Sequence, residues 1–172
     1  MTDLHSYEID DPTFVDDLKA SDKHVDRVIL WLKEKGNKVR KKKLQIRPDV
    51  EQMSEYADDG DIEIIYPNGR IGRLEIKQRM LNFTSKSDFP YNTIIVDVTH
   101  TWDNAEIKPD GYILTNKECT SAILVDSSTR DKWISSRRWD AKKGRYRNFY
   151  ECPIEYTRSV SMVKNPNGIC SM

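Results

Sequence analysis

Residues 61–77 read DIEIIYPNGRIGRLEIK, and this stretch decides which fold the chain can adopt. The Asn68-Gly69 pair is a strong signal for the turn of a β-hairpin, and isoleucines alternate with charged residues on both sides of it. The stretch therefore predicts two antiparallel strands, Asp61–Tyr66 and Arg70–Lys77.

The register of this hairpin follows from its side-chain pattern. A two-residue loop mixes apolar and charged side chains on each face, whereas a register shifted by one residue separates them. The shifted register needs an odd loop or a bulge, and Gly69 or Gly72 can supply the positive φ. One face then carries Ile62, Ile64, Tyr66, Leu74 and Ile76, and the other carries Asp61, Glu63, Arg73, Glu75 and Lys77.

In this register Glu63 faces Arg73 as an ion pair, but Asp61 faces Glu75. Like charges across a ladder are destabilising, so a divalent cation, the nearby Lys77 or a raised carboxylate pKa must offset the repulsion. Two carboxylates beside a lysine make a hard-oxygen site suited to Mg²⁺. Such an ion polarises a phosphate and lowers the pKa of bound water, while the lysine stabilises developing charge.

The remaining pattern predicts one domain over residues 1–172. Four apolar residues at helical spacing predict a helix over Ser21–Lys35, after a shorter helix near 12–20. Apolar or alternating runs predict strands at 39–46, 93–98, 111–115, 121–126 and within 149–160, with a short turn or helix at 102–107. The expected fold class is α/β (α+β), with a central mixed sheet flanked by helices.

Composition excludes several classes of protein. The longest apolar runs are far shorter than the ~20 residues that a membrane-spanning helix needs, so no membrane partner is expected. The N-terminus lacks the pattern of a signal peptide, and three widely spaced cysteines without a CxxC pair fit neither a disulfide scaffold nor a zinc ribbon. These features predict a cytoplasmic protein.

The charges balance at 28 basic and 28 acidic residues, yet they are segregated along the chain. Residues 33–47 and 130–147 carry net charges of +7 and +6, whereas 1–20 and 49–63 carry −5 and −7. Fields more than about a Debye length apart act independently, so zero net charge does not exclude a nucleic acid.

The second basic block, the C-terminal part of the domain at about 127–160, interleaves bases with Trp133, Trp139 and Tyr146. Basic side chains bind phosphates and exposed aromatic rings stack on unpaired bases, although a solvated charged surface over buried rings explains the pattern equally well. The residues expected to bind DNA are Lys41, Lys42, Lys43, Arg137, Arg138, Lys142, Lys143 and Arg145.

Asp61, followed after thirteen residues by Glu75-Ile76-Lys77 on an apolar strand, resembles the core of the PD-(D/E)XK, restriction-endonuclease-like nucleases. The preceding helix and the following strands are similar to the order of that core, over about residues 21–126. The resemblance implies that Asp61, Glu75 and the main-chain carbonyl of Ile76 bind Mg²⁺, for which Mn²⁺ can substitute. It also implies that Lys77 is catalytic and that Gln78 contacts the phosphate or the attacking water.

Some positions depart from the family pattern. Gly60 stands where the motif has proline, and the acid that the family has on its first helix has no clear match among Asp22, Asp26 and Glu34. Asp26 is the preferred candidate. A second such pattern, from Asp110 to Glu118, ends in a threonine where lysine is required, so we set it aside.

The resemblance thus implies an Mg²⁺-dependent DNA endonuclease that leaves a 5′-phosphate and a 3′-hydroxyl. One site cuts one strand, so double-strand cleavage requires a homodimer or two successive events. The alternatives are a catalytically inactive DNA-binding or protein-binding member of the same fold, and a nuclease acting on RNA. Small size and dense charge suit a phage or mobile-element protein, or a repair or restriction enzyme.

Overall fold

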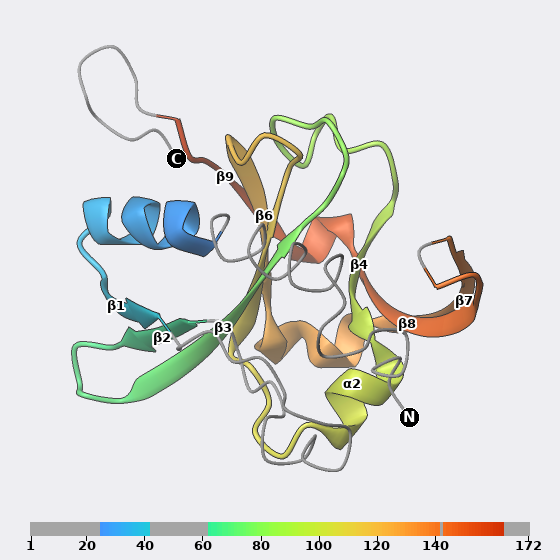
Figure 1. Ribbon diagram of the computed structural model, residues 1–172, viewed down its shortest axis with the longest axis horizontal. Helices are drawn as coiled ribbons and strands as arrows, with labels where there is room; N and C mark the ends of the chain where they lie inside the picture. Colours follow the sequence, from blue (N-terminus) through green and yellow to red (C-terminus); the bar gives the residue numbers. More distant parts are fainter. Residues whose placement is uncertain (1–24, 42–61, 142, 164–172) are drawn as a thin grey trace, which may run out of the picture.

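A computed structural model describes residues 25–41, 62–141 and 143–163 of the 172-residue chain. They form a helix over residues 25–34, a six-stranded sheet and a three-stranded sheet (Figure 1). The fold class is α+β with a mixed sheet. No helix in these ranges is long and apolar enough to cross a membrane.

The six-stranded sheet has the order β1-β2-β3-β5-β6-β9. Its strands β3 and β5 are parallel, and every other neighbouring pair is antiparallel. A parallel pair needs a long crossover, and here the crossover runs through a strand of the second sheet and a short helix. The strands are β1 (Lys38–Lys41), β2 (Ile62–Ile65), β3 (Ile71–Gln78), β5 (Gly111–Thr115), β6 (Ser121–Asp126) and β9 (Arg158–Ser161).

The three-stranded sheet is antiparallel, with the order β4-β8-β7. It consists of β4 (Thr93–Val98), β8 (Arg145–Pro153) and β7 (Ile134–Asp140). The short helices between strands are α2 (Thr99–Asn104), η2 (Ser127–Lys132) and η3 (Ile154–Tyr156). The sequence pattern did not predict this second sheet or strand β7, and α2 begins three residues before the expected turn.

The predicted register of the hairpin is confirmed. Glu63 pairs with Arg73 and Ile64 with Gly72, as the separation of apolar and charged side chains requires. The loop has an odd number of residues: the Tyr66 amide donates to the Arg70 carbonyl (2.9 Å), and three residues lie between these two. Gly69, with φ of +85°, supplies the left-handed residue, and Gly72 does not.

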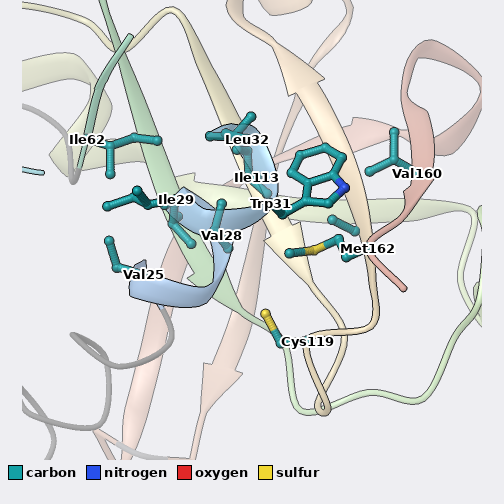
Figure 2. Close-up of a cluster of buried hydrophobic side chains, with 12 residues drawn as sticks. Val25, Val28, Ile29, Trp31, Leu32, Ile62, Ile113, Cys119, Val160 and Met162 are labelled. Atoms are coloured by element: carbon teal, nitrogen blue, oxygen red, sulfur yellow. The ribbon is translucent and has the colours of Figure 1, made fainter. Parts of the chain in front are cut away.

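Two hydrophobic clusters cover the two faces of the six-stranded sheet. The first joins the helix over residues 25–34 to the apolar face of the hairpin, with Val28 and Ile62 fully buried (Figure 2). The second joins the opposite face to the three-stranded sheet, around Tyr112, Leu114 and Val96. On this second face β4 and β8 provide the cover, and the short helix α2 adds Trp102.

Candidate functional site

The charged face of β3 is turned toward the three-stranded sheet. Residues paired across a ladder point to the same side, and Glu75 pairs with Tyr112 in β5, whose side chain lies between the sheets. Lys77, two residues along, shares this face. The side chain of Glu75 is therefore buried, with 7% of its surface exposed, while Lys77 is partly exposed.

Asp97, in β4 of the three-stranded sheet, contacts Tyr112 and Lys77. Its Oδ2 accepts a hydrogen bond from the Tyr112 hydroxyl (2.9 Å), and its Oδ1 lies 2.8 Å from the Val98 amide and 3.5 Å from the Lys77 ammonium. The side chain is 5% exposed, and a carboxylate buried so deeply needs such partners. The structure thus places Asp97, Lys77 and Tyr112 in one polar contact between the sheets.

A β-bulge accompanies this contact. The register between β4 and β8 shifts between Ile95 and Asp97, so one extra residue lies in β4 there. Bulges redirect side chains and are common beside functional sites. The sequence held one signal for Asp97: it is the single charged residue in the apolar run TIIVDV. The partners of this carboxylate, Tyr112 and Lys77, lie in other strands, so the apolar run alone does not indicate its role.

Several predicted site residues do not join this group. Asp26 lies on the helix that covers the opposite face of the sheet, where its Oδ1 forms an ion pair with the Lys41 ammonium (2.7 Å). The Gln78 amide donates to the Lys117 carbonyl (2.7 Å), and the Ile76 side chain is buried in the helix-facing cluster.

Asp61, Lys42, Lys43 and Lys142 lie outside the described residues. In the sequence Asp61 directly precedes Ile62, whose partner across the hairpin is Leu74, the residue before Glu75. Within the described ranges no three His, Cys, Asp or Glu side chains lie close enough together to hold a metal ion.

The basic, aromatic C-terminal segment forms a hairpin from β7 and β8, hereafter the aromatic hairpin, which curls away from the body of the protein (Figure 1). Trp139 and Tyr146 are paired across it with ring centroids 5.2 Å apart, and both are more than half exposed. The Arg137 guanidinium lies 5.2 Å from the centre of the Tyr146 ring. Exposed aromatic rings therefore do alternate with bases here, whereas Trp133 is buried in the core.

Arg138 differs from its neighbours on the aromatic hairpin. Its Nε and Nη2 donate to the two carboxylate oxygens of Glu151 at 2.5 and 2.7 Å. Lys143 and Arg145 lie at the end of the hairpin, on the β8 side of its turn. Of the predicted DNA-binding residues of this segment, Arg137, Arg138, Lys143 and Arg145 therefore share one projecting element.

Comparison with known proteins found no match: no family model fits the chain, and no curated protein or solved structure is detectably similar to it.

Proposed function

We propose that this protein is an Mg²⁺-dependent DNA endonuclease of the restriction-endonuclease-like type. The observation that carries the proposal is that Glu75 and Lys77 share one face of β3, where the Lys77 ammonium lies 3.5 Å from the buried Asp97. The D…ExK resemblance requires an acid and a lysine two residues apart on the same face of a strand. Glu75 and Lys77 meet this requirement on β3, which forms a tight hairpin with β2.

The order of elements supports the proposal. An amphipathic helix precedes three antiparallel strands, and the third of these carries Glu75 and Lys77 and pairs in parallel with β5. The aromatic hairpin, with Arg137 and Arg145, offers cationic surface for a phosphate backbone. In the sequence a second basic run, residues 38–43, precedes β2.

In this proposal Glu75 and Asp61 hold the metal ion, and Lys77 orients the attacking water or stabilises charge on the phosphate. Mg²⁺, when bound, lowers the pKa of a coordinated water and polarises the phosphate. Burial of Glu75 favours this role because a carboxylate in a poorly solvated position gains most from a cation.

The test is a cleavage assay on supercoiled plasmid, single-stranded DNA, branched DNA and RNA, with Mg²⁺ or with EDTA. We expect the wild-type protein to cut DNA only with Mg²⁺, and Asp61→Asn, Glu75→Gln and Lys77→Ala to cut it at least about 100-fold more slowly. Glu118→Gln is the matched control, because Glu118 is an exposed acid in the turn between β5 and β6 and belongs to the pattern set aside above. It should cut like the wild type.

Two outcomes contradict the proposal. Wild-type protein that binds DNA and never cuts any substrate of the panel favours the alternative of a silent DNA-binding protein on the same fold. Cleavage confined to RNA identifies a ribonuclease. The plasmid product also separates nicking from double-strand cleavage, because one site cuts one strand.

A further inference from the structure

A cavity of about 280 Å³ opens between the segment after β3 and the three-stranded sheet. Its walls include Arg79, Leu81, Phe89, Tyr91, Arg138 and Glu151. Pockets for drug-sized ligands occupy roughly 300–1,000 Å³, so this cavity suits one small group rather than a peptide segment.

The cavity adjoins the candidate site. Arg79 follows Lys77 by two residues, a step of about 6.6 Å along an extended chain, and its Nη2 donates to the Ile95 carbonyl (2.6 Å). Lys77 in turn meets Asp97, two residues beyond Ile95. The end of β3 is thus joined to β4 by two contacts: Lys77 with Asp97 at the candidate site, and Arg79 with Ile95 at the wall of the cavity.

One wall of the cavity is an aromatic shelf. Tyr91 is 59% exposed, yet its ring is held by an edge-on contact with Phe89, at 6.0 Å between centroids. Phe89 in turn contacts Phe83 edge-on at 5.3 Å, and both phenylalanines are buried. A tyrosine supported in this way offers a fixed ring face on which a flat ligand can stack, and every nucleobase has such a face.

The Glu151 carboxylate in the cavity wall is fully hydrogen-bonded. Oε1 of Glu151 accepts from Thr93 (2.6 Å) and from Nη2 of Arg138, and Oε2 accepts from Nε of Arg138 and from Ser136. These four bonds fill the acceptor positions of the carboxylate. Glu151 therefore acts as an anchor that holds the guanidinium of Arg138 at the cavity.

Arg79 adds a second cation at this wall. Burial lowers its pKa, while the charge of Asp97 acts in the opposite direction, and an arginine stays protonated in either case. The cavity walls thus carry two arginines and one carboxylate, of which Arg138 and Glu151 pair with each other, while Arg79 lies within the field of Asp97.

We propose that the cavity binds a single unpaired nucleobase of the DNA substrate, stacked on Tyr91, next to the phosphate that lies at Glu75 and Lys77. The proposal rests on the proposed function in taking DNA as the substrate. It names the substrate class: DNA with unpaired nucleotides at the cut, because a base inside a continuous duplex cannot enter a cavity without leaving the stack.

Binding and cutting are measured separately. In EDTA, fluorescence anisotropy gives the dissociation constants of a single-stranded oligonucleotide set, in which an abasic residue replaces one base at each position in turn. We expect the wild type to bind one of these abasic oligonucleotides about 5- to 100-fold more weakly than the intact oligonucleotide. Tyr91→Ala should bind that abasic oligonucleotide and the intact one equally well. Tyr91→Phe keeps the ring and should behave as wild type. Tyr156→Ala removes an exposed tyrosine outside the cavity and is the matched control.

The same oligonucleotides, single-stranded or annealed to a full complement, are then incubated with Mg²⁺. We expect the wild type to prefer the unpaired form at least about tenfold and Tyr91→Ala to lose the preference. If the protein cuts DNA but Tyr91→Ala changes neither the binding nor the preference for unpaired DNA, the cavity proposal is overturned and the proposed nuclease function stands. A Tyr91-dependent base effect without any cutting supports the cavity and overturns the nuclease. Absence of DNA binding overturns both.

Discussion

The ammonium group of Lys77 lies 3.5 Å from Oδ1 of Asp97, and these two residues come from different sheets. Asp97 is almost fully buried, while Lys77 is partly exposed, so the acid is the fixed partner and the lysine is the one held in place. The contact therefore couples the position of a proposed catalytic side chain to the packing of the three-stranded sheet.

Asp97→Asn tests this coupling. The asparagine keeps one acceptor oxygen, so it can serve either the Tyr112 hydroxyl or the Val98 amide, and it removes the charge beside Lys77. We therefore expect the DNA-cleavage rate at saturating Mg²⁺ to fall about tenfold. Tyr112→Phe is the comparison, because it removes the hydroxyl bond and leaves both charges. It should cost about 1 kcal/mol of unfolding free energy and change the rate less. Single-turnover rates and urea unfolding measure both effects, and equal rates for Asp97→Asn and wild type would contradict the coupling.

Alanine should destabilise the protein at both glycines of the hairpin, but for different physical reasons. Gly69 has open space around it but a φ of +85°, so Gly69→Ala should destabilise the protein by about 1 kcal/mol through backbone strain alone. At Gly72 an added Cβ would lie 2.4 Å from Oδ2 of Asp110 and 2.5 Å from Cε2 of Tyr66. Asp110 also accepts from the Arg73 amide (3.0 Å), so it cannot move without losing that bond.

Gly72→Ala should therefore cost more than Gly69→Ala, at about 1–3 kcal/mol in urea unfolding. Gly69→Asn serves as a control because asparagine tolerates the left-handed region, so it should recover part of the loss caused by alanine. A larger loss at Gly69 than at Gly72 would contradict the prediction that the steric conflict with Asp110 and Tyr66 costs more than the backbone strain.

Glu151 gives a pH-dependent prediction. Burial acts to raise the pKa of this carboxyl, but hydrogen bonds from Arg138 and Thr93 outweigh burial and hold the pKa below its ordinary value. A carboxylate with a lowered folded-state pKa stabilises the protein above the unfolded-state pKa, and this contribution is lost as the pH falls through the folded-state value.

Glu151→Gln should therefore lower the unfolding free energy by about 1.5–3 kcal/mol at pH 7, and the difference from wild type should shrink as the pH falls below 4.5. Urea titrations at pH 7, 5 and 3 measure this difference. Glu155→Gln, at an exposed acid of η3 two residues after β8 ends, controls for general effects of charge. A difference that stays constant with pH would mean that the carboxylate is not the stabilising group.

The local pattern of the sequence was sufficient for part of the fold. Strands β4, β5 and β6 were predicted with the residues they have, and the hairpin register was correct, because alternation and turn chemistry act between near neighbours. Strand β7 was missed because most of its side chains are exposed, so its pairing with β8 rather than any burial pattern makes it a strand.

The candidate site was less accessible to sequence reasoning. Glu75 and Lys77 were found because they are close in sequence on one face of a strand. Asp97 was missed because it joins the site through its hydrogen bond with Tyr112, which lies in a strand of the other sheet. Glu63 lies opposite Arg73 as predicted. Its carboxylate also forms an ion pair with Arg40 on β1 (2.5 Å), a contact that the sequence pattern did not predict.

The aromatic hairpin gives a last prediction, on binding rather than cutting. Trp139 is 56% exposed and contacts mainly Tyr146, so Trp139→Ala should leave the unfolding free energy nearly unchanged and weaken single-stranded DNA binding by about tenfold. Arg137→Ala should instead reduce the slope of log K against log salt by roughly 0.7, because one phosphate contact with a single strand is lost. Arg158→Ala, at an exposed base on β9 at the far edge of the six-stranded sheet, should change neither quantity. Anisotropy titrations at several salt concentrations separate these results, since loss of stacking lowers affinity at every salt concentration and loss of a cation changes the slope.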